Sequence, residues 1–272
     1  MPRCVWAGKI VFPLFLSPVS KLGIMRLLLA SLALSFLLCP SLRAERKTAI
    51  FLADGFDFPV GKPDGEGYYK ARGYIPNGHL GEDWNGRAGG DTDLGAPVYS
   101  TAHGIVVFAK NYHHGWGNVV IVRHAYYEGG QTKFVDSLYG HLDKIEVRYG
   151  QHIKRGQGIG TIGTGGGIYP AHLHFEMRKD LRVGMARDSF PRDDSVYWSG
   201  TQFIAARRKL TPPTATALAP VDTFSADTGK MAATEGEAAS GFILPHAAPA
   251  PKPGSTVPGR YDDLRKMLEQ KK

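Results

Sequence analysis

One short segment of this 272-residue chain constrains both its fold and its chemistry: Pro170–Met177, with the sequence P-A-H-L-H-F-E-M. Side chains of a β-strand alternate between its two faces, so this pattern places imidazoles and a carboxylate opposite large apolar groups. The polar members are His172, His174 and Glu176, and the apolar members are Leu173, Phe175 and Met177. The segment therefore predicts a strand with one face in the core and the other on the wall of a polar site.

Two motifs upstream carry histidines that can join this site. The first is Gly78–Asp83 (G-H-L-G-E-D), with His79 and Asp83, and the second is Leu138–Leu142 (L-Y-G-H-L), with His141. A spacing of four would put His79 and Asp83 on one face of a helix. The internal glycine and the flanking Asn-Gly pairs are turn signals, however, so we expect this motif at a strand end and loop.

The donor set of the three motifs suits a metal centre. Zinc takes imidazole nitrogens and carboxylate oxygens, and a catalytic zinc site keeps one position open for water. His172 and His174 lie too close in angle for both to bind one tetrahedral ion easily, so one should be a ligand and the other should work beside the metal. The motif residues thus supply three ligands and two proton-handling groups: His79, Asp83, His141, His172 and His174.

In this order, H-x-x-x-D, a lone His and H-x-H resemble the LytM/lysostaphin-type zinc metallopeptidases, which cut peptide bonds in peptidoglycan. The resemblance extends to intervening segments that are similar to the family's strands and turns: Gly95–Tyr99 (G-A-P-V-Y), Gly117–Ile121 (G-N-V-V-I) and Val147–Gly163. It covers the chain from Gly78 to Arg178. The family fold is an antiparallel sheet of the duplicated hybrid motif type, with an open groove across one face that holds the metal.

The resemblance also implies a role for each motif residue. His79, Asp83 and His174 would bind one Zn²⁺ per chain, and His141 and His172 would be the catalytic pair. In the family's mechanism the metal activates a water and polarises the scissile carbonyl. One histidine takes the proton of the water, and the other stabilises the oxyanion or protonates the leaving amine. The implied function is a zinc endopeptidase acting on peptidoglycan peptides in cell-wall remodelling or lysis.

Two other functions are compatible with the same fold. A catalytically silent module could bind wall peptides and activate another cell-wall hydrolase, and an extracellular protease could cut protein outside the wall. Relatives that have lost activity usually lack metal ligands, whereas none is missing here. The endopeptidase is therefore the leading hypothesis.

Residues 45–208 have the texture of a β domain. Short apolar alternations are separated by Gly, Asn and Asp, which predicts a mainly β fold, an antiparallel β-sandwich or barrel-like sheet. The alternations are Val98–Tyr99, Ile105–Phe108, Val119–Val122, Phe134–Tyr139, Ile145–Val147 and Gly158–Ile162. Asp188–Ala206 predicts an extra turn and a short helix that close the domain.

The first 44 residues predict a secretory signal or an uncleaved N-terminal membrane anchor. Met25-Arg26 provides a positive start, Leu27–Leu38 an apolar core and Ser41–Ala44 a cleavage site. Met25 is also a candidate for the true initiator. In either case we expect an extracytoplasmic protein, in the periplasm, in the cell envelope or secreted.

This leader carries both cysteines and most of the basic excess. The chain has a net charge of +8, but five basic and no acidic residues lie in residues 1–44, which leaves +3 for the remainder. Such a mild excess does not demand a nucleic-acid partner. Cys4 and Cys39 both lie in the leader, so the mature protein would have no disulfide and no thiolate ligand. We expect a monomer that meets a membrane only through an uncleaved leader.

Residues 209–272 are rich in Ala, Pro and Thr. Such a segment cannot bury enough apolar surface to offset its ordering entropy, so we expect a disordered tail. Its last part, Tyr261–Lys272, could form a short amphipathic helix.

Other polar residues have weaker claims to function. Five histidines are expected to be structural or exposed: His103, His113, His114, His152 and His246. His124 ends an apolar strand and is a candidate neighbour of the site, although no motif supports it. Three tyrosines are expected either to pack along the groove wall or to contact substrate: Tyr68, Tyr69 and Tyr74. Asp91 and Asp93 suggest a solvated loop, and Gly163–Gly167 a backbone that passes close to the substrate.

Overall fold

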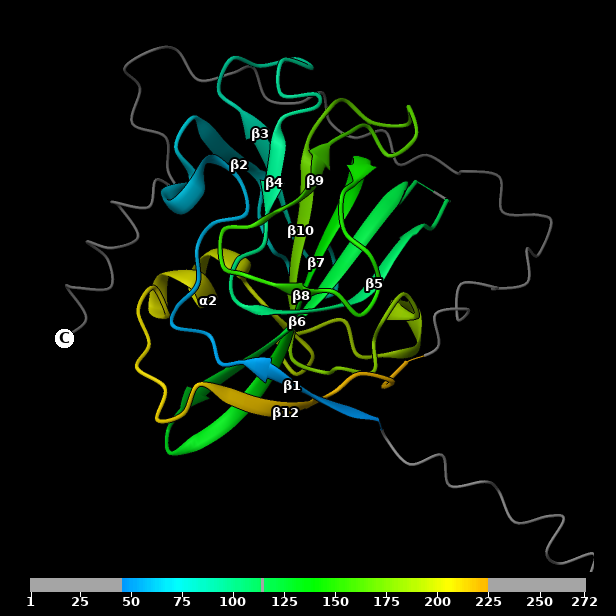
Figure 1. Ribbon diagram of the computed structural model, residues 1–272. Helices are drawn as coiled ribbons and strands as arrows, with labels where there is room; N and C mark the ends of the chain where they lie inside the picture. The colour runs from blue at the N-terminus through cyan, green and yellow to red at the C-terminus, as the bar shows by residue number, and fades with distance from the viewer. Residues whose placement is uncertain (1–45, 114, 225–272) are drawn as a thin grey trace, which may run out of the picture. The chain divides into compact units, whose positions relative to one another are not determined.

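The computed structural model describes residues 46–113 and 115–224, which form antiparallel sheets with few helices (Figure 1). The strands are β1 (Lys47–Phe51), β2 (Tyr68–Arg72), β3 (Glu82–Gly86), β4 (Pro97–Tyr99), β5 (Gly104–Asn111), β6 (Asn118–Glu128), β7 (Gln131–Ile145), β8 (His152–Ile153), β9 (Gly158–Ile162), β10 (Leu173–Arg178), β11 (Tyr197–Trp198) and β12 (Thr216–Pro220). The helical segments are the short turns η1 (Gly61–Gly65) and η2 (Arg187–Ser189) and the helix α2 (Gly200–Ala206). The predicted mainly β, antiparallel fold is confirmed. Across these residues, no helix has the length and apolar character needed to span a membrane.

Most strands belong to one large sheet with the order β2-β3-β10-β7-β6-β5-β8, and β4 joins it through β9 and β7. Strand β7 has 15 residues and pairs with β6 on one side and with β10 and then β9 on the other. Asp136–Gly140 pair with β10, whereas Leu142–Ile145 pair with β9. Its ladders with β6 and β9 both shift register near residue 142. Because such shifts bend a strand, β7 changes direction near His141.

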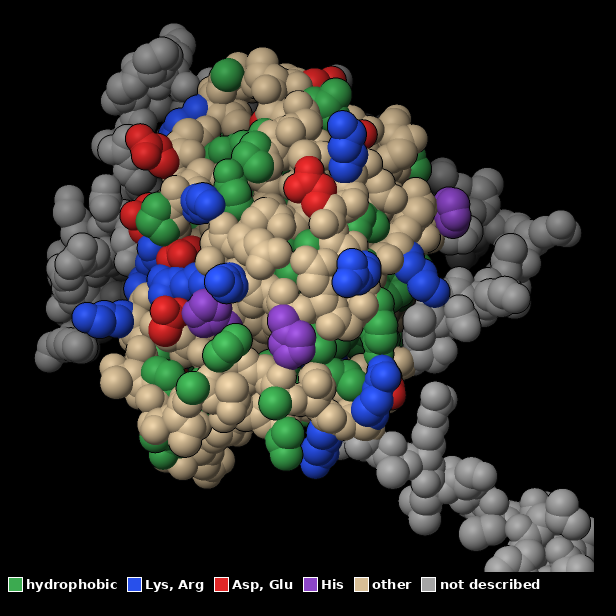
Figure 2. Space-filling view, viewed as in Figure 1, with side chains coloured by type: hydrophobic (Ala, Val, Ile, Leu, Met, Phe, Trp, Pro, Cys, Tyr) green, Lys and Arg blue, Asp and Glu red, His purple; other side chains and the backbone are tan. Residues whose placement is uncertain are grey.

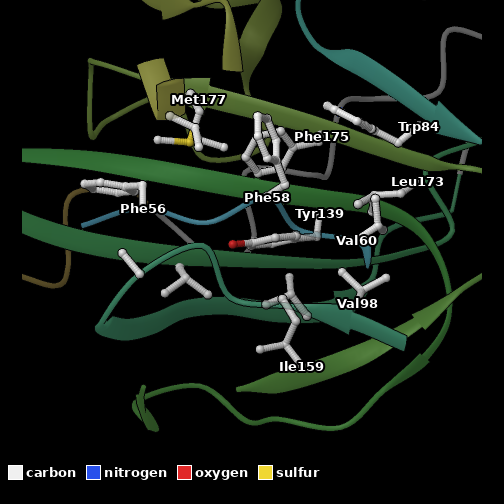
Figure 3. Close-up of a cluster of buried hydrophobic side chains, with 14 of the residues drawn as sticks. Phe56, Phe58, Val60, Trp84, Val98, Tyr139, Ile159, Leu173, Phe175 and Met177 are labelled. Atoms are coloured by element: carbon white, nitrogen blue, oxygen red, sulfur yellow. The ribbon is translucent and has the colours of Figure 1, made fainter. Parts of the chain in front are cut away.

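The central strands of the large sheet are buried on both faces. Val120 and Val122 of β6 belong to a cluster that includes residues of β4 and β9, whereas Val119 and Ile121 belong to a second cluster with β1 and β12. Figure 3 shows the first cluster, in which the side chains of β4 and β9 approach those of β7 and β10. A strand that is covered on both faces needs apolar residues at successive positions, and this explains the continuous V-V-I-V of β6.

Five of the six predicted strand segments are confirmed, and the sixth is wrong. Strand β7 already ends at Ile145, the first residue of the predicted segment Ile145–Val147. After it, the Glu146 amide donates to the carbonyl oxygen of Ile159 at 3.0 Å. Val147 packs against the core outside any strand. Its apolar character therefore reflects packing and not strand pairing.

The prediction of disorder from residue 209 onwards is wrong for Thr216–Pro220. This segment forms β12 and pairs antiparallel with β1. This strand buries Ala219, and the Arg123 guanidinium donates to the carbonyl oxygen of Pro220 at 2.7 Å. Composition averaged over a window misses a short strand whose partner lies at the start of the domain. Residues 225–272, the leader 1–44 and His114 lie outside the described residues, as do His246 and the terminal helix predicted there.

The predicted closing helix is present as α2. The side chain of Ser199 accepts a hydrogen bond from the Gln202 amide at 3.5 Å and so caps its first turn. Phe203 and Ile204 point into the first core cluster. On the face shown in Figure 2, basic and acidic side chains are interspersed among other residues.

His124 is a core residue, and the expectation that it neighbours the site is wrong. Its side chain is fully buried and packs edge-on against Phe56 at 5.6 Å between ring centroids. Nδ1 donates to the carbonyl oxygen of His103 at 2.9 Å, and Nε2 lies 2.7 Å from Ser137 Oγ. His124 pairs with Val135, six residues before His141 on β7. At ~3.4 Å per residue, this separation along the strand is about 20 Å.

Protonation of His124 should destabilise the fold as the pH falls. Burial lowers the pKa of His124 from 6.5 to about 4. Between these values the unfolded chain binds a proton that the folded protein does not, so stability falls as the pH decreases through this range and is unaffected above it. At roughly 1.4 kcal/mol per pKa unit the loss is about 3 kcal/mol. Denaturant unfolding at several pH values measures it.

A His124→Gln variant provides the control, because its amide can form hydrogen bonds but does not titrate. The dependence of its unfolding free energy on pH should be shallower between pH 6.5 and 4. An NMR resonance of His124 that titrates near pH 6.5 in the folded protein would contradict the prediction.

Candidate metal centre and active site

Strand β10 lies between β3 and β7, and this pairing assembles the metal-binding group. His174 pairs with Asp83 on one side and with Gly140 on the other, while His79 lies in the loop before β3. His174 Nδ1 is 2.9 Å from Asp83 Oδ1 and 3.2 Å from His79 Nε2. His79 Nε2 is 3.1 Å from Asp83 Oδ1. One ligand atom from each residue therefore lies within 4.8 Å of the other two.

The outward nitrogen of each imidazole is held by an acceptor. His79 Nδ1 donates to the carbonyl oxygen of Gly73 at 3.0 Å, and His174 Nε2 donates to Glu176 Oε1 at 2.9 Å. These bonds direct His79 Nε2 and His174 Nδ1 toward Asp83. Metal-ligating histidines are typically held in this way, and two imidazoles with one carboxylate form a donor set that zinc accepts. The residues present thus fit the metal that the sequence predicts.

The electrostatics of the group favour a positive charge between its members. Burial alone would lower the pKa of His174, but hydrogen bonds and charge from Asp83 and Glu176 raise it to about 9. Burial would likewise raise the pKa of Asp83, but hydrogen bonds with His174 and His79 hold it far below its usual range. A metal ion can supply this positive charge in place of the proton.

Gly81 allows the loop before β3 to approach β10 closely. A Cβ atom at this position would lie 2.7 Å from His174 Cε1 and 2.7 Å from the carbonyl oxygen of Phe175. Only a glycine can pass the ligand at this distance without displacing it. The glycine inside the first motif is therefore a packing requirement of the metal site as well as a turn signal.

His141 occupies the bend of β7. Its φ of 61° lies in the left-handed region that residues other than glycine rarely adopt. The His141 amide donates to the carbonyl oxygen of Trp116 at 2.9 Å, and its ring lies 5.5 Å from that of His174, centroid to centroid. Strained backbone of this kind is concentrated at functional sites.

His141 and His172 form a pair beside the metal-binding group. Their ring centroids are 4.8 Å apart, and both residues are buried. His172 Nδ1 donates to the carbonyl oxygen of Pro170 at 2.8 Å, while its Nε2 lies 3.8 Å from Asp83 Oδ1. Burial, followed by the charge of His174, lowers the pKa of His141 to about 3, so its imidazole is neutral at pH 7. The structure thus brings all five predicted site residues together.

Two aromatic residues, Trp116 and Tyr169, line this pair of histidines. Neither belongs to the histidine motifs of the sequence. The ring of Trp116 lies 5.3 Å from His174 and 6.1 Å from His141, and the ring of Tyr169 lies 4.8 Å from His141 and 5.9 Å from His172. Trp116 comes from the β5–β6 connection and Tyr169 from the loop before β10. One sequence signal could have identified these two residues. Each is an aromatic residue next to Gly or Pro, in a loop that adjoins the histidine motifs.

The glycine-rich segment Gly163–Gly167 lies against the pair. A Cβ on Gly165 would be 2.9 Å from Tyr169 Cδ2 and 3.2 Å from His141 Nδ1. The segment therefore makes room for the two rings. Its proximity to substrate remains a prediction.

Asp91 and Asp93 support the site, and the solvated-loop interpretation is wrong for Asp93. Asp93 is only 5% exposed, and its Oδ2 accepts from the Gly86 amide at 2.8 Å. Asp91 Oδ1 accepts from the Ala171 amide at 2.7 Å, directly before the H-x-H strand. The D-T-D-L loop thus fastens the end of β3 and the start of β10.

Among the remaining candidates, Tyr68 and Tyr74 pack against apolar clusters, which favours the packing alternative for both. His103 contacts the Arg155 amide at 3.1 Å and Asp54 at 3.6 Å. His113 lies in the β5–β6 connection, and His152 is exposed on β8.

Replacement of Gly81 with alanine should weaken zinc binding. The new Cβ would force His174 away from the loop before β3, and we expect a roughly tenfold lower affinity with a loss of about 1–3 kcal/mol in stability. Competition with a chromophoric chelator and thermal unfolding measure the two effects. Gly158→Ala on β9 is the matched control, since its Cβ would meet only Glu146 Oε2, at 3.8 Å. Equal zinc affinities in the two variants would refute this account of Gly81.

The chain is similar in sequence to known proteins. Residues 78–186 match the sequence profile described as Peptidase family M23. The chain is 37% identical over 119 residues to the peptidoglycan DD-endopeptidase ShyA of Vibrio cholerae, a match that covers 43% of this chain and 26% of ShyA. It is 38% identical over 84 residues to the lipoprotein NlpD of Yersinia enterocolitica, covering 31% of this chain and 78% of that relative.

The murein hydrolase activator NlpD of Escherichia coli K12 is also 38% identical over 84 residues, covering 31% of this chain and 20% of the activator. The chain thus spans about a quarter of the length of ShyA and a fifth of this NlpD. Among solved structures, the catalytic domain of lysostaphin from Staphylococcus simulans is 26% identical with a TM-score of 0.39, covering 52% of this chain and 94% of that domain. With the profile match and the extensive coverage of the Yersinia relative, the chain belongs to peptidase family M23, the lysostaphin/LytM-type peptidases.

Proposed function

We propose that the protein is a zinc-dependent endopeptidase that hydrolyses peptide bonds in peptidoglycan. The observation that carries this proposal is a complete His-Asp-His group with two buried imidazoles beside it. Family membership supports the class of reaction, and the relative named a peptidoglycan DD-endopeptidase supports the class of substrate.

His79, Asp83 and His174 would hold one zinc ion per chain. When bound, zinc lowers the pKa of a water molecule and polarises the scissile carbonyl. The two neighbouring imidazoles then have to move a proton and stabilise the negative charge that develops on the carbonyl oxygen.

The hydrogen bonds favour different roles for these imidazoles. His172 keeps its proton on Nδ1 because that atom donates to the Pro170 carbonyl, so Nε2 offers a lone pair on the side of Asp83. His172 is therefore the better base, and Asp83 stabilises the imidazolium that forms. The same proton can then pass to the leaving amine.

His141 is better placed as a donor. Its Nδ1 is buried without a hydrogen-bond partner, so a proton on that atom would be an unsatisfied buried donor. The proton is more favourable on Nε2, and the low pKa of His141 keeps the ring neutral. A neutral N–H can stabilise the oxyanion without giving up its proton.

The cell envelope is the expected place of action. The predicted secretory leader would take the domain out of the cytoplasm, and the relatives include a lipoprotein and a peptidoglycan endopeptidase. We infer that the protein acts as a monomer on peptidoglycan peptides.

A second candidate function is a silent module that activates another wall hydrolase. The relatives named murein hydrolase activator match 84 to 108 residues of the chain, and this observation favours it. The complete donor set and the catalytic pair favour the endopeptidase instead.

Replacement of His172 with alanine should reduce activity by roughly 10²–10⁴-fold, since a general base is lost, while zinc stays bound. His141→Asn should also retain zinc and lose activity, and asparagine tolerates the left-handed backbone at this position. Asp83→Ala should lose zinc as well as activity. Metal content by elemental analysis, measured with turnover on the same samples, checks all three. Loss of zinc from His172→Ala would overturn the division between ligands and catalytic residues.

The proposed function itself is tested by the release of new amino termini from purified peptidoglycan. Release should require zinc and stop with a chelator, and mass analysis of the fragments identifies the bond. Stoichiometric zinc without cleavage would reject the endopeptidase. An increase in cleavage by an added wall amidase would then support the activator.

A further inference from the structure

A row of buried charges leads from the metal-binding group into the middle of the large sheet. Glu176 and Arg178 follow His174 on the same face of β10. Arg178 pairs with Asp136 of β7, which pairs in turn with Arg123 of β6. These four side chains are at most 2% exposed, and their charges alternate in sign along the row.

Glu176 connects the row to the metal ligand. Its Oε1 accepts from His174 Nε2 at 2.9 Å, and its Oε2 accepts from Arg178 Nε at 2.6 Å. One oxygen of the carboxylate thus holds the ligand, and the other is held by the guanidinium. The orientation of His174 depends on where Arg178 places Glu176.

Arg178 is itself fixed on several sides. It also donates to the carbonyl oxygen of Gly184, and its guanidinium lies 6.0 Å from the ring centroid of Tyr197. Asp136, opposite Arg178 on β7, is instead bound by two hydrogen bonds from Arg123, at 2.7 and 2.6 Å. The Glu176 carboxylate, the Gly184 carbonyl and the ring of Tyr197 therefore restrict Arg178, and the Arg123–Asp136 pair is a separate one.

Stability alone does not explain a buried Glu176–Arg178 pair. Apolar residues of similar volume are often as stable or more stable at such positions, because burying charges has a large desolvation cost. A charged Glu176, however, is a stronger acceptor for a ligand imidazole than a neutral group. Arg178 compensates that charge and fixes the carboxylate.

We propose that Arg178 is a positioning residue for the metal centre: it fixes Glu176, which holds His174 with Nδ1 directed at His79 and Asp83. The inference rests on the proposed zinc site and extends it to a residue that does not touch the metal. The role of Arg178 should appear in the affinity for zinc. Replacing residues that hold a metal ligand in place typically changes metal affinity 10–100-fold.

Arg178→Met should weaken zinc binding roughly 10–100-fold in a chelator competition assay, and Arg178→Lys should recover part of the loss. Arg123→Met is the matched control, because it breaks an equally buried pair that does not contact Glu176. We expect it to lower the unfolding midpoint but to change zinc affinity less than about twofold.

Glu176→Gln completes the test if Arg178→Met does not fold. Glutamine keeps the size of the side chain but replaces one carboxylate oxygen with an NH₂ group. That group cannot accept a hydrogen bond from His174 or Arg178, so zinc binding should again weaken. If Arg178 acts through Glu176, the double variant Glu176→Gln, Arg178→Met should bind zinc no more weakly than Glu176→Gln alone.

Wild-type zinc affinity in folded Arg178→Met, or additive losses in the double variant, would overturn this inference and leave the proposed function intact. Failure of the wild-type protein to bind zinc would instead remove the proposed function. A loss in Arg123→Met as large as that in Arg178→Met would show a general effect of stability and reject the positioning role.

Discussion

Backbone hydrogen bonding of β10 to β3 and β7 sets the positions of the site residues. The pairing His174↔Asp83 brings two ligand side chains together from strands that are far apart in sequence, and His174↔Gly140 places His141 one residue beyond. A slip of one residue in either ladder would turn these side chains to the opposite face of the sheet. The apolar face of β10, with Phe175 and Met177 in the core, prevents that slip. The register that positions the site is thus maintained by core packing.

The bend of β7 is the second constraint. A regular strand would carry residue 141 along the same sheet, whereas the bend allows β7 to pair with β10 before it and with β9 after it. His141 adopts an unfavourable backbone conformation there. The surrounding hydrogen bonds, from its own amide to Trp116 and along both ladders, maintain this conformation. His141 stands on a core strand and His172 is held by its bridge to Gly163, so we expect the geometry of the pair to be rigid.

Side-chain alternation and donor chemistry predicted much of this arrangement. The H-x-H strand has one polar and one apolar face as expected, and the five motif residues gather at one place. Periodicity failed where an element depends on distant partners. Thr216–Pro220 becomes a strand because β1 offers it an edge, and Asp93 is buried because the end of β3 needs an acceptor. Trp116 and Tyr169 could not be placed because loop conformation, and not spacing, brings them to His141.

The loops at the site orient their histidines through main-chain carbonyl groups: Gly73 for His79 and Pro170 for His172. Every residue type carries a carbonyl, so the side chains at these two positions are not needed for the tautomers of the histidines. Natural or laboratory evolution could therefore exchange the side chains at these two positions while the proton positions on the two imidazoles persist. By contrast, insertions or deletions that move either carbonyl would disturb the chemistry directly. We therefore expect the loops that carry these two carbonyls to tolerate changes of residue type but not changes of length.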